Sequence, residues 1–234
     1  MSSRRRPARS TARRRAPAPR TSSPSLFWVL LTALVVAGVV AIVVVVVTGD
    51  DDGGSGADAV QVDGRALPDF EDPVDDPAVG DPAPGLEGVG FDGEPVATPE
   101  AGTPFVAVFL AHWCPHCQAE VPRIVSLADA GGTEGVDVLG IATGTNPDAP
   151  NYPPEDWLER ERWPFPVLED TADGRAASAY GLTSYPLLVF VDAEGRVAAR
   201  VSGEIPEEDL ATMFAALAAG EPVPVPGAGP ASPG

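Results

Sequence analysis

Residues 109–122 read FLAHWCPHCQAEVP, and this stretch decides the fold. It joins an apolar run, 105–110, to sequence of helical character that begins at Pro115. The two cysteines of the chain, Cys114 and Cys117, lie three positions apart at this junction. A cysteine at a helix N-terminus faces unpaired backbone N–H groups and the positive end of the helix dipole, and both stabilise a thiolate. The spacing therefore predicts a reversible disulfide between Cys114 and Cys117.

Three other interpretations compete with this prediction, and one of them, two buried inert thiols, does not suit a helix start flanked by two histidines. A purely stabilising disulfide across so short a loop would contribute only about 2 kcal/mol in the chain-entropy model. A zinc or copper ion could bind Cys114, Cys117, His112 and His116, but the sequence has no other Cys or His to complete a distal ligand set. We therefore expect neither a metal nor another cofactor.

Outward from the motif, apolar runs of strand length alternate with helical stretches from about residue 78 to residue 220. Strands are expected at 105–110, 136–141, 165–168, 187–191 and 196–201, a hairpin at 89–96, and helices at 115–130, 154–163, 173–180 and 206–219. Strands that are apolar on both faces need a covering layer on each side of their sheet. The sequence thus predicts one α/β domain over 78–220.

Charge divides the chain into two parts. Residues 1–48 contain eight of the 15 basic residues and no acid, whereas all 34 acidic residues follow residue 48. Between these parts, residues 26–47 carry no charge and would form a helix about 33 Å long, enough to cross a hydrocarbon core of about 30 Å. The stretch is too long for a signal peptide and lacks a small-residue cleavage site. We predict an uncleaved, single-pass transmembrane helix at 26–48.

The charge asymmetry also predicts the orientation. The basic N-terminus is expected to stay cytoplasmic, which places the acidic domain on the extracytoplasmic side of the cell membrane. Residues 1–25 are then a disordered basic arm, 49–77 an acidic disordered linker and 221–234 a Pro/Gly-rich disordered tail. A formal net charge of −19 argues against nucleic acid as a partner.

The segment 109–122 resembles the active-site segment of thioredoxin-like proteins, in particular the membrane-tethered TlpA/ResA branch of the redoxins. That branch typically reads F-W-A-x-W-C-x-P-C-x-x-E-x-P. The lead-in at 79–84 and the loop Ser184-Tyr185-Pro186, followed by an apolar strand, resemble further parts of the family. The resemblance implies a thioredoxin-like three-layer sandwich with a central mixed sheet, preceded by one transmembrane helix. It also implies protein disulfide oxidoreductase activity.

The resemblance further implies a role for each matching position. Cys114 would be the nucleophile and Cys117 the resolving cysteine, while Pro186 would be a cis-proline lying against the disulfide. Tyr185 would offer its backbone atoms to a substrate strand. Glu120 would take the proton of Cys117 as that thiol becomes a nucleophile. The alternative for Glu120 is an ordinary solvated acid on a helix.

The sequence departs from the branch at Pro115-His116, which resembles the DsbA-type oxidases. His116 can donate to the Cys114 thiolate or add positive charge beside it, and a stabilised reduced form makes the disulfide a stronger oxidant. Trp113 would be a lid beside the disulfide or a substrate contact. His112 receives no role.

The net direction of electron flow stays open at this point. The pair would either oxidise exported client proteins or reduce particular disulfides, as in cytochrome c maturation, and each needs a membrane redox partner to recycle it. Two other functions would require different motifs. A redoxin-type peroxidase needs a P-x-x-x-[TS]-x-x-C context that the residues before Cys114 do not supply, and a copper chaperone of the Sco type needs C-x-x-x-C and a distal His.

Overall fold

The computed structural model describes residues 60–227. The predicted basic arm, the predicted transmembrane helix at 26–48, the first part of the predicted linker and the end of the tail lie outside these residues. Within 60–227, no helix is both long enough and apolar enough to cross a bilayer.

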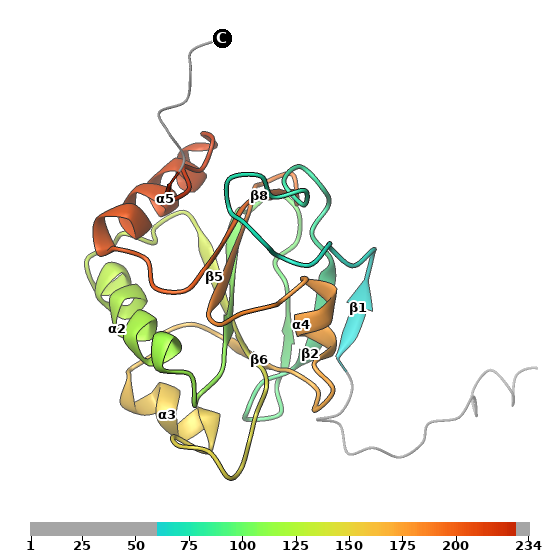
Figure 1. Ribbon diagram of the computed structural model, residues 1–234, viewed down its shortest axis with the longest axis vertical. Helices are drawn as coiled ribbons and strands as arrows, with labels where there is room; N and C mark the ends of the chain where they lie inside the picture. Colours follow the sequence, from blue (N-terminus) through green and yellow to red (C-terminus); the bar gives the residue numbers. More distant parts are fainter. Residues whose placement is uncertain (1–59, 228–234) are drawn as a thin grey trace, which may run out of the picture. The chain divides into compact units, whose positions relative to one another are not determined.

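A five-stranded mixed sheet forms the centre of the domain (Figure 1). Its strands are β4 (Phe105–Leu110), β5 (Asp137–Ala142), β6 (Val167–Glu169), β7 (Leu187–Val191) and β8 (Val197–Ser202), in the order β6-β5-β4-β7-β8. The strands β4, β5 and β6 are parallel to one another, and β7 is antiparallel to both of its neighbours. The predicted α/β fold with a mixed sheet is confirmed, and the observed strand ends lie within two residues of those expected.

Helices cover both faces of this sheet, which gives three layers (Figure 1). The helices α2 (Pro115–Asp129), α3 (Pro154–Arg160) and α5 (Glu207–Ala219) lie on one face, and α4 (Arg175–Ala179) lies on the other. Alternate residues of β4 serve the two cores. Val106 and Val108 pack with α2 and α5, whereas Ala107 and Phe109 pack with α4. Because both sides of β4 are buried, its sequence is apolar without interruption.

A small antiparallel sheet lies on the α4 side. It consists of β1 (Gln61–Asp63), β2 (Gly85–Val89) and β3 (Pro95–Ala97), in that order. The predicted hairpin is the β2–β3 pair, and its turn is closed by a hydrogen bond from the N–H of Gly93 to the carbonyl of Gly90. Leu86 of β2 is buried in the same core as α4.

The prediction that residues 49–77 form a disordered linker is wrong for 60–77. Strand β1 pairs with β2, and Val60, Leu67 and Phe70 are buried in the core on the α4 side. The segment is fixed further by Asp76, which forms a buried ion pair with Arg200 of β8. Strand pairing, three buried apolar residues and one buried carboxylate thus fix a stretch whose composition is typical of a solvated spacer.

The predicted disordered tail also needs a correction over 221–227. These residues have no regular secondary structure, but Val223 and Val225 pack against the core on the α2 side. The sequence EPVPVP places a valine at every second position, so an extended chain presents both to the same surface. The folded domain therefore spans at least 60–227.

Candidate active site

The Cys motif follows directly from the end of the buried strand β4. Cys114 is the N-cap of α2, with φ −76° and ψ 122°, and Pro115 follows at the first helical position. No acidic side chain lies in the first turn of the helix, and no side chain caps it. Cys114 therefore lies at the N-terminal end of α2, where unpaired N–H groups and the positive end of the helix dipole favour a thiolate.

The two sulfurs differ in their surroundings. Cys114 is 6% exposed and Cys117 is fully buried, and both are free thiols. The Sγ of Cys117 accepts a hydrogen bond from the N–H of Ala111 at 3.5 Å. Burial raises the pKa of Cys117 well above its ordinary value, and the negative charges of Cys114 and Glu120 add to the increase. Cys114 is therefore the sulfur that a client sulfur can reach, and Cys117 keeps its proton to a higher pH than an ordinary thiol does.

The predicted cis-proline loop lies against the outer sulfur. The Tyr185–Pro186 peptide bond is cis, and the Cys114 Sγ lies 3.8 Å from the carbonyl oxygen of Tyr185. The residues are 71 positions apart in the chain, and β4 and β7, which pair directly, bring them together. This is the position in which Tyr185 can offer its backbone to a bound chain.

The rings of Trp113, in the Cys motif, and Tyr185, in the cis-proline loop, contact each other. Their rings meet edge to face, with centroids 5.6 Å apart, and the Trp113 indole N–H donates to the carbonyl of Gly144 at 2.8 Å. Gly144 has φ +61°, and a Cβ there would lie 2.7 Å from the Tyr185 hydroxyl. The loop after β5 therefore holds both rings in place. That this loop belongs to the site was not predicted from the sequence.

Glu120 is buried completely, so it is not an ordinary solvated acid. Its Oε2 accepts hydrogen bonds from Arg123 at 2.9 Å and from the N–H of Ile205 at 3.0 Å. Its Oε1 is buried and has no hydrogen-bond partner among residues 60–227. Burial raises the pKa of Glu120, although Ile205 and Arg123 oppose this increase. A carboxyl of raised pKa one turn after Cys117 is suited to exchange a proton with it.

The side chain of His116 is exposed and turns toward Glu204. Its Nδ1 lies 3.0 Å from the Glu204 Oε1. The predicted hydrogen bond from His116 to the Cys114 sulfur does not occur among the contacts of the described residues. The loop between β8 and α5 brings a carboxylate within reach, and a charged partner attracts the imidazole more strongly than a buried thiol. Its role in setting the potential remains a prediction.

His112, to which no role is assigned from the sequence, joins the motif to the loop after β5. It is 1% exposed. Its Nε2 accepts the N–H of Asn146 at 3.1 Å, so its proton is on Nδ1, which donates to the carbonyl of Pro150 at 2.7 Å. With both nitrogens occupied, the ring offers no lone pair to a metal. No cluster of three or more Cys, His or acidic residues suited to a metal occurs within 60–227.

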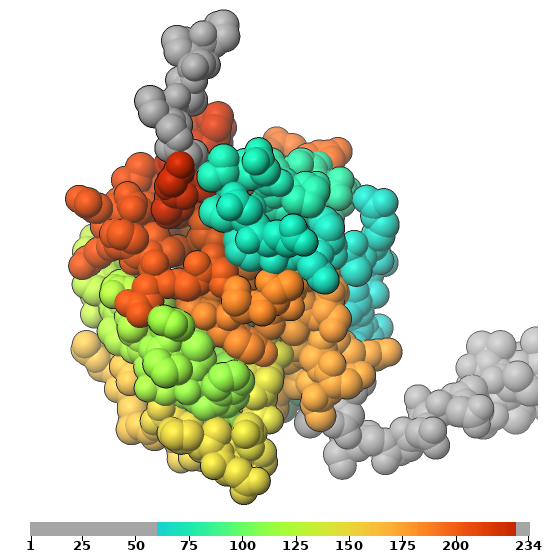
Figure 2. Space-filling model, viewed as in Figure 1, coloured from blue at the N-terminus to red at the C-terminus, as the bar shows by residue number. Residues whose placement is uncertain are grey.

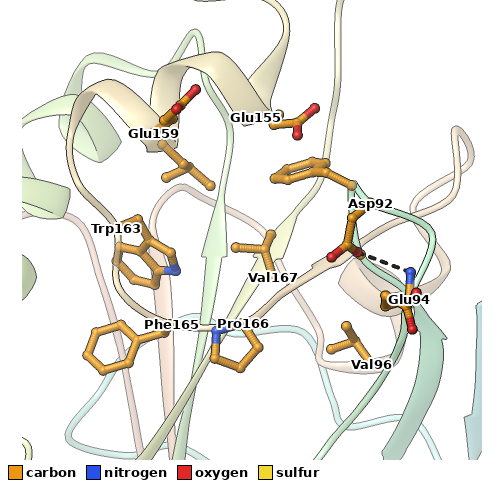
Figure 3. A pocket seen from close by; sticks show the side chains of 12 residues that line it. Asp92, Glu94, Val96, Glu155, Glu159, Trp163, Phe165, Pro166 and Val167 are labelled. Atoms are coloured by element: carbon orange, nitrogen blue, oxygen red, sulfur yellow. Dashed lines mark hydrogen bonds between the residues drawn. The ribbon is translucent and has the colours of Figure 1, made fainter.

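Two hollows of similar size are relevant to where a substrate binds. One, of about 420 Å³, adjoins the motif and is lined by His116, Tyr185, Phe70 and Glu71. The other, of about 400 Å³, is shown in Figure 3: Trp163, Phe165 and Val167 form an apolar wall below the carboxylates of Glu155 and Glu159. No residue of the Cys motif lines this second hollow, so the first is the one placed for thiol chemistry.

Comparison with known families agrees with this geometry. Residues 79–200, just over half of the chain, match the family described as AhpC/TSA. The chain belongs to the AhpC/TSA family. The match begins in the lead-in before β2 and ends in β8, so it includes the Cys motif and the cis-proline loop.

Curated relatives support the resemblance to the TlpA/ResA type. The thiol-disulfide oxidoreductase ResA of Geobacillus thermodenitrificans is 28% identical over 102 residues, which cover 44% of this chain and 56% of that protein. The thiol:disulfide interchange protein DsbE homolog of Paracoccus denitrificans is 31% identical over 109 residues, covering 45% of this chain and 54% of its own. The chain thus spans about half the length of these relatives.

Solved structures support the fold. A thiol:disulfide interchange protein of the thioredoxin family from Chlorobium tepidum is 23% identical, with a TM-score of 0.50, and the match covers 64% of this chain and 99% of that one. A conserved protein from Geobacillus kaustophilus is 24% identical, with a TM-score of 0.54, and covers 62% of this chain and 85% of its own. The domain of the AhpC/TSA protein described here has a thioredoxin-like fold.

Proposed function

We propose that the chain is a protein disulfide oxidoreductase that exchanges disulfides with client proteins through Cys114 and Cys117. One observation carries the proposal: Cys114 caps α2 beside the cis Tyr185–Pro186 bond, with the Tyr185 carbonyl 3.8 Å from its sulfur. A client chain bound along that loop would bring its own sulfur to Cys114. The adjoining hollow of about 420 Å³ would hold the neighbouring client residues.

The exchange balances without a cofactor. In the reducing direction, the Cys114 thiolate attacks a client disulfide, one S–S bond breaks, a mixed disulfide forms, and one client sulfur leaves as a thiolate that takes a proton. Glu120 then accepts the proton of Cys117, and the Cys117 sulfur attacks that of Cys114. The second client sulfur leaves, and a Cys114–Cys117 disulfide remains. In the oxidising direction the same steps run backward.

Trapping tests the proposal directly. A Cys117→Ser variant of the full chain lacks the resolving thiol, so it should accumulate a mixed disulfide when mixed with an oxidised model protein. A Cys114→Ser variant should form little, because the remaining Cys117 is buried. Gel shift without reductant and mass spectrometry would measure both. Equal trapping by the two variants, or none by either, would contradict the proposal.

We infer an oxidising direction from Pro115-His116, while a reductive role of the ResA type is the alternative. The midpoint potential of the pair distinguishes them: about −120 mV marks a DsbA-like oxidant and about −270 mV a reductant. We expect the oxidising half of this range. A His116→Ala variant should be more reducing, and an unchanged potential would exclude His116 as the cause.

The domain is also proposed to be tethered outside the cytoplasm by residues 26–48, next to a membrane partner that recycles the pair. The uncharged stretch and the basic residues before it support this arrangement. The full chain, produced in bacteria, should resist carbonate extraction from membranes, and added protease should digest its domain in spheroplasts but not in intact cells. Release by carbonate or protection in spheroplasts would contradict the tether or its orientation.

A further inference from the structure

Four side chains form a series of contacts that begins at the exposed His116 of the Cys motif and ends at the buried carboxyl of Glu120. The Nδ1 of His116 lies 3.0 Å from the Oε1 of Glu204, and the Oε2 of Glu204 accepts from Arg123 at 2.8 Å. The same guanidinium donates to the Oε2 of Glu120 at 2.9 Å. The contacts therefore form an uninterrupted series from His116 to Glu120.

The series depends on the loop between β8 and α5. Glu204 supplies the carboxylate in its middle, and the next residue, Ile205, donates its N–H to the Oε2 of Glu120. In Figure 2 the green surface of α2 lies directly against the orange-red surface of this part of the chain. This loop thus contacts three side chains of α2, those of His116, Glu120 and Arg123. It lies more than 80 residues further along the chain.

Arg123 is shared between two carboxylates, and its charge cannot neutralise both. Glu120 is fully buried, whereas the Arg123 side chain is 33% exposed and that of Glu204 is 39% exposed. Arg123 and the Ile205 N–H lower the pKa of Glu120, while burial and the charge of Glu204 raise it. The other ionisable group facing Glu120 is Cys117, whose own pKa is raised in part by Glu120.

We propose that Glu204 and Arg123 are positioning residues that couple His116 to Glu120, so that charge at the exposed histidine sets how readily the buried carboxyl exchanges a proton with Cys117. When His116 holds Glu204, more of the charge of Arg123 is available to Glu120. When His116 is removed, Glu204 competes for Arg123 more strongly. The proposal rests on the proton-acceptor role of Glu120 in the proposed function.

The titration of Glu120 itself provides the test. The full chain in detergent micelles would be labelled with ¹³C at the glutamate carboxyls and kept reduced, and the Glu120 signal would be assigned by its loss in Glu120→Gln. In Arg123→Met the titration midpoint should rise by about one pH unit or more, because the cation that pairs with Glu120 within residues 60–227 is gone. In Glu204→Gln it should fall by about half a pH unit.

A matched control separates a specific contact from general charge removal. Glu208→Gln removes one negative charge four residues from Glu204, on an exposed side chain, and its effect should be less than about 0.2 pH unit in 0.15 M salt. His116→Asn should raise the Glu120 midpoint. The effect of Glu204→Gln should shrink by at least half in an Arg123→Met background, because the coupling passes through Arg123.

The inference is overturned if Glu204→Gln shifts the midpoint no more than Glu208→Gln does. It is also overturned if the shift is the same with and without Arg123. Should Arg123→Met fail to fold, the comparison of Glu204→Gln with Glu208→Gln decides alone. A chain that exchanges disulfides but shows no coupling contradicts only this inference. A chain that shows coupling but cannot be trapped with a client contradicts the proposed function.

Discussion

Two buried carboxylates, one on each side of the central sheet, have opposite surroundings. Asp76 receives Arg200 at both oxygens, at 2.8 and 2.6 Å, and the N–H of Ala78 at 3.0 Å. Glu120 has two donors on Oε2 and none among the described residues on Oε1. Both side chains are fully buried, yet only Asp76 has a donor at each of its two oxygens.

The difference indicates how burial of an acid relates to its role. A buried carboxylate that is paired at both oxygens with a buried guanidinium joins the two segments that carry these groups, so its function is to hold them together. A carboxyl with one unbonded oxygen can take a proton there with little rearrangement. Asp76 therefore joins 60–77 to the sheet, and Glu120 is left available for chemistry.

The largest loss of stability is expected when Asp76 is removed. Asp76→Ala leaves the Arg200 guanidinium buried without a counter-charge, so the free energy of unfolding should fall by about 3–5 kcal/mol. Urea denaturation followed by tryptophan fluorescence would measure it. Asp81→Asn, which breaks the exposed pair with Arg65, should cost less than about 1 kcal/mol. Similar losses in the two variants would show that burial does not distinguish these ion pairs.

The Asp76–Arg200 pair also shows why sequence reasoning ended the domain too early. Ten acids within 49–77 predict a solvated chain, and nothing local shows that one of them meets a cation 124 residues later. The sequence does show an arginine, Arg200, within the largely apolar strand β8. A buried arginine needs an acidic partner, so its presence could have indicated that a distant acid is also buried. Its partner depends on the tertiary fold, which composition does not report.

The parts of the site that neighbouring residues determine could be predicted from the sequence. The contacts between residues far apart in the chain could not. Cys114 at the start of α2 follows from the order of strand, motif and Pro115, and the cis bond before Pro186 follows from the family resemblance. The contacts of Glu204 and the two hydrogen bonds of His112 come from loops that are distant in sequence. Such contacts require knowing which loops meet at the end of the sheet.

Removing the incompletely bonded carboxyl should reduce the rate at which a mixed disulfide is resolved. In Glu120→Gln the attack of Cys117 on a mixed disulfide should slow by about 10²-fold, because the side chain can no longer accept the thiol proton. Quenched-flow decay of a preformed Cys114 mixed disulfide would measure the step. Glu208→Gln is the matched exposed control and should retain the normal rate. A Glu120→Gln rate equal to that of the control would remove Glu120 from the mechanism.

His112 extends the comparison to a third buried polar side chain. Both of its ring nitrogens are bonded, so it should behave like Asp76. His112→Ala leaves the Asn146 N–H and the Pro150 carbonyl without their partner and should lower the free energy of unfolding by about 1–3 kcal/mol. His116→Ala, at an exposed position, should change it by less than about 0.5 kcal/mol. The idea fails if His112→Ala costs no more than His116→Ala.

The smallest expected effect lies in how stability changes with pH. The pKa of Glu120 is raised above its ordinary value of 4.5, so the folded state keeps this proton to a higher pH than the unfolded state does. The free energy of unfolding should therefore fall as pH rises from the ordinary pKa of Glu120 to its raised pKa in the folded state. Glu120 contributes at most about 1.4 kcal/mol of this fall per pH unit.

Glu120→Gln lacks this proton, so the difference in unfolding free energy between wild type and variant should decrease as pH rises from about 4.5. Urea unfolding of the reduced protein between pH 4.5 and 8 would measure this difference. The upper limit lies below 9.0, the ordinary pKa of a thiol, so the titration of Cys117 in the unfolded state does not contribute. A difference that is flat or increases with pH would mean that burial does not raise the pKa of Glu120 in the folded state. The contrast with Asp76 would then no longer explain why one carboxylate is structural and the other reactive.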